Sequence, residues 1–512
     1  MRTESTRVEK DMRRFVSCTT ILALALVAWL PASKVQANEM ADWRIADAIE
    51  DEFLYDEVVP LYNLDVGVTG GIATLDGTVD NLLAKKRATR IARTIKGVRS
   101  VVNDIEVKPA ISKSDRALAG DVETALLTDP ATESYEIDVT ASDGMITLTG
   151  TVQSYQEKDL AESVAQGISG VNDVTNDITV DYKADRSDYE IQKEIEQTLK
   201  YDALVDDTLI EVKVKDGHVT LEGSVNSAAE KFEAQDDAWV AGVKGVDAAK
   251  LEVVAIGGAE KRDPLYASVT DDEIRDAINA ALLYDPRVLS TNVSVEVNAG
   301  YVTLRGDVNN LKAKRAAGSD ARNTAGVLHV RNRLRVDSGF DLANSTLKDR
   351  VESALQRDVI TADEDITVLA TNGTVRLYGT VESYYEKAQA GDVAERVLGA
   401  EVVDNNIVVR SSYDLYSYDP FIDYWDVYDY DWYEYTPPAP VVTTKADSVI
   451  KEDIESQLWW SPFVDSDQIN VSVEDGVATL TGVADSATER RIATQNALEG
   501  GAVSVTNKIA VQ

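Results

Sequence analysis

The sequence predicts an α/β (α+β) protein made of six small tandem domains, each with the element order αββαβ. Three observations support this: one hairpin pattern recurs six times, an amphipathic helix pattern precedes it, and a second helix and a closing strand follow it. The first glycines of the hairpins are 73, 73, 83, 73 and 103 residues apart. These periods exceed the 20 to 50 residues typical of solenoid repeats and suit small domains on one chain.

The hairpin is read most easily in "DGHVTLEGSV", which begins at Asp216. Apolar and polar residues alternate on both sides of an Asp-Gly turn, which predicts two antiparallel strands with one solvated face. The first glycine of each copy is expected to take a positive φ, and the second to lie where the strand bends or another element comes close. The twelve structural glycines are Gly71, Gly77, Gly144, Gly150, Gly217, Gly223, Gly300, Gly306, Gly373, Gly379, Gly476 and Gly482.

The helices are predicted from their caps and apolar spacing. In the fourth repeat, Thr270 and Glu273 form a capping-box pattern before apolar residues at helical spacing over 274–282. In the first repeat, an Ala/Ile stripe over 84–95 predicts the second helix, with Gly97 as its C-terminal cap. The two helices are expected on one face of each sheet.

Five repeats close with a strand of the form Asn-x-Ile/Leu-x-Val, such as Asn332 to Val336. A right-handed crossover into this strand gives a three-stranded mixed sheet. The third repeat departs, with "AKLEV" at 249–253 and a displaced Gly245, so its second helix is expected to end differently.

These patterns divide the chain into six domains separated by two longer linkers, at 255–267 and 412–445. The predicted domains are 40–110, 113–184, 186–254, 268–338, 342–411 and 446–512.

Residues 1–37 have the order of a secretory signal: Arg13 and Arg14, an apolar run over 15–30, and a small-residue cleavage site ending at Ala37. Cleavage there predicts a periplasmic protein, and the alternative is an envelope protein anchored by an uncleaved signal. The sole cysteine, Cys18, lies in this segment, so the mature chain is expected to have no disulfide or thiolate site.

The charge balance is strongly acidic. The net charge is −38, and without residues 1–37 the chain has 45 Lys/Arg against 86 Asp/Glu, a net charge of −41. Such a surface repels nucleic acid and anionic bilayers at long range, so no nucleic-acid partner is expected and any lipid contact must use a local patch.

The glycine hairpin, the Ala-rich second helix and the "GV..V.N.I.V" ending resemble the BON domain, named for bacterial osmotically inducible and nodulation proteins. All six repeats carry the resemblance, over roughly four fifths of the chain. It implies a periplasmic binding module for phospholipid or other envelope components, with no catalytic residue. We therefore expect a non-enzymatic protein that supports the cell envelope under osmotic or related stress.

The residues themselves offer little chemistry. The only histidines are His218 and His329, and no nucleophile elbow, phosphate-cradling loop or spaced metal-ligand set is present. We expect no catalytic residue, no metal and no cofactor.

The segment 413–435 interrupts the repetition with eleven aromatic residues, seven acids and no basic residue. It is either a linker whose rings pack on the neighbouring domains, or an acidic aromatic strip for a basic protein, a glycan or a cation. The second reading supports an alternative function as a periplasmic protein–protein scaffold. Its candidate partner residues are Tyr424, Trp425, Tyr428, Tyr430, Trp432 and Tyr433.

The second unusual stretch is "QLWWSPF" at 457–463, where two tryptophans replace the usual Tyr-Asp neighbourhood of the sister repeats. Trp459, Trp460 and Phe463 either fill a core or form an interfacial anchor for lipid, because Trp favours the boundary between water and headgroups.

Overall fold

The computed structural model describes residues 41–409 and 445–511, except 57, 133–135, 183–185, 255–268, 286, 289–291, 341 and 503. The predicted signal at 1–37 and the acidic aromatic strip at 413–435 therefore lie outside the described residues.

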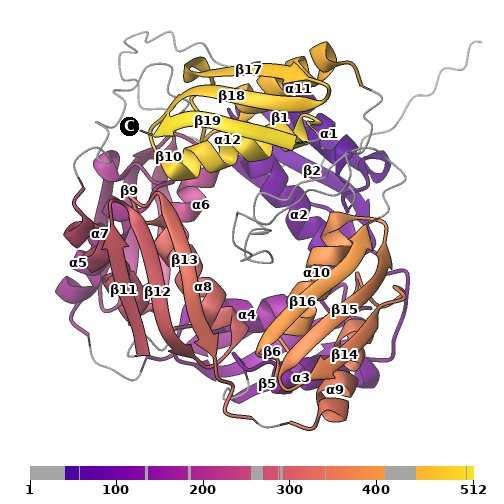
Figure 1. Cartoon of the computed structure of the whole chain (residues 1–512). Coiled ribbons are helices and arrows are strands. Elements are labelled where there is room, and N and C mark those ends of the chain that lie inside the picture. Colours follow the sequence, from indigo (N-terminus) through magenta and orange to yellow (C-terminus); the bar gives the residue numbers. More distant parts are fainter. Residues whose placement is uncertain are drawn as a thin grey trace, which may run out of the picture. The chain divides into compact units, whose positions relative to one another are not determined.

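Each repeat, here called a unit, has the predicted order αββαβ (Figure 1). The first helices are α1 (Asp42–Tyr55), α3 (Asp115–Thr128), α5 (Asp188–Tyr201), α7 (Asp271–Tyr284), α9 (Asn344–Arg357) and α11 (Asp447–Trp460). The second helices are α2 (Leu82–Arg93), α4 (Tyr155–Gln166), α6 (Ala228–Asp237), α8 (Leu311–Asn323), α10 (Tyr384–Glu395) and α12 (Ala487–Glu499).

The strands follow the same repetition. The hairpins are β1 (Leu64–Thr69) with β2 (Ile72–Val79), β5 (Glu136–Ser142) with β6 (Met145–Val152), β8 (Ile210–Lys215) with β9 (His218–Val225), β11 (Val293–Asn298) with β12 (Tyr301–Val308), β14 (Thr367–Thr371) with β15 (Thr374–Val381), and β17 (Ile469–Glu474) with β18 (Val477–Ala484). The closing strands are β3 (Ser100–Asn103) with its short continuation β4 (Glu106–Val107), β7 (Asp173–Val180), β10 (Gly245–Val253), β13 (His329–Val336), β16 (Val402–Val409) and β19 (Ser504–Val511).

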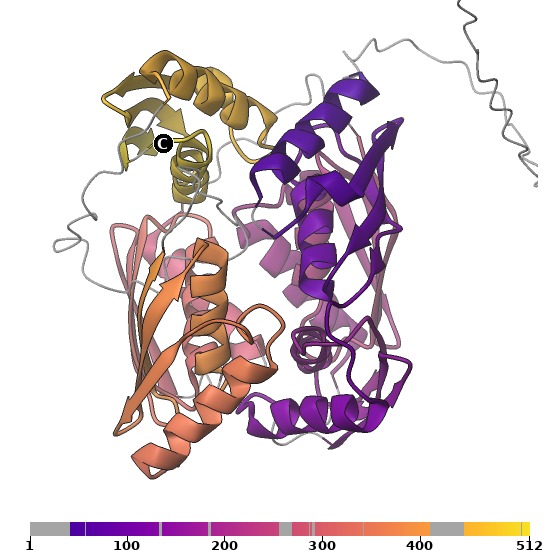
Figure 2. The same ribbon diagram turned by 90° about the vertical axis from the view of Figure 1, so that its right-hand side faces the viewer.

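Every sheet is mixed, as predicted. In the fourth unit the order is β11-β12-β13, with Val297 opposite Val302 in the antiparallel pair and Val302 opposite Val330 in the parallel pair. The second hairpin strand is central in all six units. Figure 2 shows both helices of the indigo first unit on one face of its sheet.

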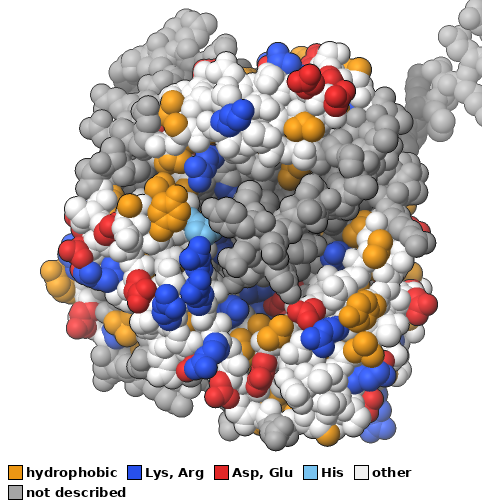
Figure 3. All heavy atoms as spheres, viewed as in Figure 1, with side chains coloured by type: hydrophobic (Ala, Val, Ile, Leu, Met, Phe, Trp, Pro, Cys, Tyr) orange, Lys and Arg blue, Asp and Glu red, His pale blue; other side chains and the backbone are white. Residues whose placement is uncertain are grey.

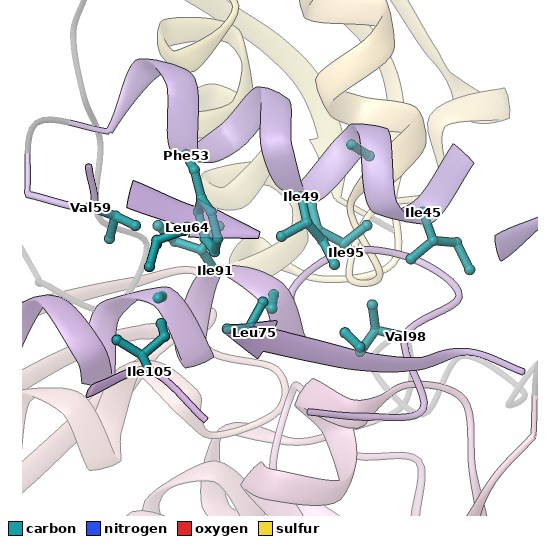
Figure 4. Close-up of a cluster of buried hydrophobic side chains, with 14 of the residues drawn as sticks. Ile45, Ile49, Phe53, Val59, Leu64, Leu75, Ile91, Ile95, Val98 and Ile105 are labelled. Atoms are coloured by element: carbon teal, nitrogen blue, oxygen red, sulfur yellow. The ribbon is translucent and has the colours of Figure 1, made fainter. Parts of the chain in front are cut away.

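Each unit has its own hydrophobic core between the two helices and the sheet. In the first unit, Ile49 and Phe53 of α1 meet Leu75 of β2 and Ile91 of α2, and none is more than 8% exposed (Figure 4). The spacing of apolar residues along the helices and strands thus places their side chains in one core.

The hairpin glycines have the backbone that their pattern suggests. The first glycine of each hairpin has φ between 74° and 81°, and the second has φ between 122° and 154°. A β-carbon on Gly306 would lie 1.8 Å from the carbonyl oxygen of Asn292, so a side chain there would displace the chain before β11.

The first residue of the first helix holds the hairpin turn. In the fourth unit the Asp271 carboxylate accepts hydrogen bonds from the N–H groups of Ala299 (2.7 Å) and Gly300 (3.0 Å). These bonds hold the pKa of Asp271 below its ordinary value. Asp42, Asp188 and Asp447 accept the same pair of bonds in their units, and Asp115 and Asn344 accept one of the two.

The asparagine of the closing strand ties that strand to the second helix. In the fifth unit Asn405 Nδ2 donates to the carbonyl oxygen of Lys387 in α10 (2.6 Å), and its Oδ1 accepts from the Ile407 N–H (3.3 Å). Asn103, Asn176, Asn332 and Asn507 make the same pair of bonds. The Asn-x-Ile/Leu pattern is therefore a structural bridge.

The third unit lacks this bridge because Ala249 stands in place of the asparagine, and β10 also contains a bulge between Asp247 and Lys250. Lys231 of α6 donates to the Leu251 carbonyl oxygen instead (2.6 Å). Its second helix does end early: α6 has 10 residues and the other second helices 12 or 13. The interpretation of Gly245 as the displaced turn glycine is wrong, since Gly242 takes the turn with φ +94° and Gly245 begins β10.

We predict that Asn405→Ala destabilises the fifth unit by about 1–2 kcal/mol, because it leaves two backbone groups without their side-chain partner. Amide hydrogen exchange of β16 in the full chain should become roughly five- to thirtyfold faster. Asn406→Ala is the matched control, since the neighbouring Asn406 is exposed and bonds only locally, to Asp404. Equal exchange in the two variants would contradict the bridge.

Candidate functional site

The last two residues of α11, Trp459 and Trp460, lie where the sixth unit contacts the first. Their rings meet edge to face, with centroids 4.7 Å apart, and Trp460 packs against the core of the first unit. The Lys96 N–H donates to the Trp460 carbonyl oxygen (2.9 Å). Gln457 Nε2 donates to Glu52 Oε1 (2.7 Å). Side chains and backbone thus join two units more than 350 residues apart.

Two cations of the first unit lie beside the rings. The Arg44 guanidinium carbon is 5.1 Å from the centroid of Trp459 and 5.8 Å from that of Trp460, and Lys96 Nζ is 5.5 Å from Trp459. These are cation–π distances. Trp459, Trp460 and Phe463 are all half-buried. The site is therefore a small aromatic surface with a basic border.

Glu52, an acid of the first unit at this contact, has a shifted pKa. Burial raises the pKa of the Glu52 carboxyl to about 7, the charges of Asp56 and Asp51 add to the rise, and the hydrogen bond from Gln457 opposes it. Asp56 is itself paired with the buried Arg87, at 2.6 Å from Nε. Glu52 therefore keeps its proton to a higher pH than an exposed glutamate does.

The backbone contact at Trp460 recurs between other units. Each acceptor is the last residue of a first helix, and each donor directly precedes the positive-φ glycine that follows a second helix. Between the second and fifth units, the Ser169 N–H donates to the Arg357 carbonyl oxygen and the Leu398 N–H donates to the Thr128 carbonyl oxygen, both at 2.9 Å. Between the third and fourth units, the Ala325 N–H donates to the Tyr201 carbonyl oxygen at 2.7 Å. One contact thus links first to sixth, second to fifth and third to fourth units.

A different contact joins units within each half of the chain, where the first residue of a second helix meets another unit of the same half. Leu82 of the first unit belongs to the core of the second. Tyr155 of the second stacks on Trp239 of the third, with centroids 3.8 Å apart. Ala228 of the third belongs to the core of the first. Leu311 of the fourth packs on the core of the fifth.

The structure brings together some predicted residues and adds others. Trp459, Trp460 and Phe463 form one region, whereas the predicted partner strip at 413–435 lies outside the described residues. Sequence reasoning missed Arg44, Glu52 and Lys96, because nothing local indicates a partner in the sixth unit.

Among the described residues, no helix is both long and apolar enough to cross a membrane. The same part of the chain has no group of three or more His, Cys, Asp or Glu residues arranged to hold a metal ion.

Comparison with protein families matches the BON domain at residues 41–109, 114–182, 187–255, 270–338, 343–411 and 446–512. The chain belongs to the BON-domain family. It is 30% identical over 147 residues to Osmotically-inducible protein Y of Escherichia coli K12, covering 28% of this chain and 73% of that protein. It is 28% identical over 180 residues to Outer membrane lipoprotein DolP of Haemophilus influenzae, covering 32% of this chain and 93% of that protein.

Among solved structures, the chain is similar to the C-terminal domain of CdsD, a structural protein of the type III secretion system of Chlamydia trachomatis. The match has a TM-score of 0.12 and 16% identity, covering 41% of this chain and 96% of the CdsD chain. A score this low supports no argument about fold or function.

We predict that the stability of the folded chain falls as the pH rises from about 4.5 to about 7, because of Glu52. The raised pKa means that the folded chain holds the Glu52 proton more tightly than the unfolded chain does, so stability falls across this window. Because Glu52 is only half-buried, we expect a loss of about 1 kcal/mol.

Calorimetry of the full chain at pH 5 and pH 8 tests this. Glu52→Gln should remove the pH-dependent part and raise the melting temperature at pH 8 above that of the unmodified chain. Glu50→Gln, on the same helix, is the control. A Glu52→Gln chain with the original pH dependence would contradict the assignment.

We also predict that the two halves of the chain associate when made as separate polypeptides, residues 38–254 and 268–512. Each of the three recurring backbone contacts crosses from one half to the other. Co-purification and light scattering should show a one-to-one complex.

Lys96→Pro should weaken that complex because it removes the N–H that bonds to Trp460. Lys96→Ala retains this N–H and serves as the matched control. Two halves that stay monomeric at about 10 µM, well above the affinity of a specific interface, would contradict the prediction.

Proposed function

We propose that this chain is a non-enzymatic protein of the bacterial envelope, secreted to the periplasm, that binds phospholipid or another envelope component. We further propose that it supports envelope integrity under osmotic or related stress. The observation that carries the proposal is the family: six BON domains make up nearly all of the described chain, and the similar proteins are named for osmotic induction and for the outer membrane.

Repetition suits a binding role. Six related units on one chain can engage one extended surface together, and the second and later contacts are then intramolecular, with a high effective concentration. Modest affinity in each unit therefore gives firm overall attachment. The fixed contacts between units keep their binding faces in a constant relation.

The proposed lipid contact is the region of Trp459, Trp460 and Phe463. With a net charge of −41 after removal of residues 1–37, the protein gains no long-range attraction to anionic headgroups. Arg44 and Lys96 provide local positive charge beside the rings. Tryptophan with neighbouring basic residues is a typical interfacial combination.

The second candidate is a periplasmic scaffold that uses the acidic aromatic strip 413–435 to bind a basic protein partner. It rests on composition: eleven aromatic and seven acidic side chains within 23 residues. The two candidates are separable, because lipid binding depends on α11 and scaffolding on the strip.

Co-sedimentation with vesicles of phosphatidylglycerol and phosphatidylethanolamine tests the lipid contact. We expect Trp459→Ala with Trp460→Ala to weaken binding roughly tenfold or more, since each inserted ring contributes on the order of 1 kcal/mol. Trp43→Ala is the matched control, because Trp43 is a more exposed tryptophan outside this region.

Since Trp460 also packs on the first unit, a second variant leaves the rings intact: Arg44→Glu with Lys96→Glu. It should weaken vesicle binding as strongly if the basic border faces headgroups. Vesicle binding that survives both double variants in a folded chain would reject this region as the lipid contact.

A further inference from the structure

The closing strand of the fourth unit presents a basic stripe in an otherwise acidic protein. His329, Arg331, Arg333 and Arg335 of β13 are all exposed, while Val330, Asn332 and Leu334 between them point toward the helices. Figure 3 shows Lys and Arg side chains gathered in a line beside a histidine, over β12 and β13. The strand alternation therefore places four basic or titratable side chains on one solvated face.

The central strand extends the stripe. By register, Tyr301 lies opposite His329, with ring centroids 6.1 Å apart, and Arg305 lies opposite Arg333. Arg305 and Arg335 are paired with Glu296 and Asp307, respectively, in exposed ion pairs. No described carboxylate forms an ion pair with Arg331 or Arg333. We call the surface of Tyr301, Arg305, His329, Arg331, Arg333 and Arg335 the β13 face.

The sister units do not share this chemistry. The matching positions are Asp173, Thr175, Asp177 and Thr179 on β7, Val402, Asp404, Asn406 and Val408 on β16, and Ser504, Thr506, Lys508 and Ala510 on β19. The BON fold therefore does not require the arginines. They are a property of the fourth unit alone among these four.

The surroundings of the histidine are also positive. The pKa of His329 is lowered by burial, then by the charges of Arg331 and of Arg490 in α12. Unpaired arginines with an aromatic neighbour suit a ligand that carries both carboxylates and rings, because guanidinium pairs with carboxylate and stacks on aromatic faces.

The chain contains one segment of that chemistry. The strip 413–435 has seven acids and eleven aromatic residues and no basic residue. Trp425 follows Val409, the last residue of β16, by 16 residues, which can span up to about 50 Å. A folded body of this size has a radius of gyration of only about 23 Å, so the strip can reach the β13 face.

We propose that the β13 face is the docking surface for the acidic aromatic strip 413–435 of the same chain. The tether gives the strip an effective concentration of about 1 mM at this face, so an external acidic ligand has to compete with it. This goes beyond the proposed envelope binding, because it assigns an intramolecular partner to the β13 face.

The first test uses a full chain in which 413–435 is replaced by a Gly/Ser linker of equal length, together with a fluorescent peptide of sequence 413–435. By anisotropy, the peptide should bind the replaced chain at least tenfold more tightly than the original chain, in which the face is occupied. Arg331→Glu with Arg333→Glu should weaken peptide binding to the replaced chain at least tenfold.

Lys508→Glu is the matched control, since Lys508 is exposed at the position on β19 that corresponds to Arg333. It should leave peptide binding unchanged. Equal binding to the original and replaced chains, or binding indifferent to Arg331 and Arg333, would overturn the proposal.

The second test follows the two histidines of the full chain by NMR. Carboxylates near an imidazole raise its pKa, so the NMR titration of His329 should lie at higher pH in the original chain than in the replaced chain. The NMR signals of His218, in the turn of the third unit, are the control and should match in the two chains. An unchanged His329 titration would overturn the proposal.

Anionic vesicles test whether lipid headgroups, and not the strip, bind the β13 face. If the replaced chain fails to bind the peptide but binds vesicles through Arg331 and Arg333, the β13 face serves headgroups and the docking proposal is wrong. Vesicle binding through Trp459 and Trp460 is measured in the same chains. Failure of the docking proposal therefore leaves the proposed lipid contact independently testable.

Discussion

The hydrogen bond from the N–H before a turn glycine to the last carbonyl of a first helix in another unit is the contact on which the assembly of units depends. A helix leaves its final carbonyl groups without partners inside the helix, and a unit of about 70 residues has little chain left to supply them. The glycine that follows each second helix takes a positive φ, and in four units the N–H of the residue before it donates to another unit. The same backbone feature therefore serves Lys96, Ser169, Ala325 and Leu398 with four different side chains.

This contact explains how the two unusual tryptophans can both join two units and present rings for binding. Trp460 uses its carbonyl oxygen as its sister residues do, and adds a ring that packs on another unit. Trp459 lies beside two cations, Arg44 and Lys96, and is not among the residues that pack on the core of the first unit. A shared structural position thus leaves room for a specialised side chain, which is how one unit of a repeat can acquire a binding site without changing the fold.

Charge is distributed differently at the contacts and at the solvated faces. Where units meet, acids are buried or partly buried, and the pKa of groups such as Glu52 and Asp358 is raised by burial, in both cases to a value between about 6 and about 7. On the open sheets, most units present acidic or neutral residues, and the fourth presents arginines. The net charge therefore says little about either place, because it averages over surfaces with opposite local character.

The sequence by itself determined the unit: the αββαβ order, the mixed sheet, the two positive-φ glycines and the family all follow from local periodicity and turn chemistry, which repeat six times. It misplaced the turn glycine of the third unit, because Gly242 and Gly245 both follow the second helix and only the backbone shows that Gly242 takes the positive φ. It indicated Trp459 and Trp460 as unusual, but their partners Arg44, Glu52 and Lys96 could be found only in the tertiary structure. Contacts between units use backbone groups and side chains hundreds of residues apart, and the turn glycine at these contacts recurs in all six units without indicating which units meet. For that reason the tertiary structure alone decided which units meet and which faces stay open.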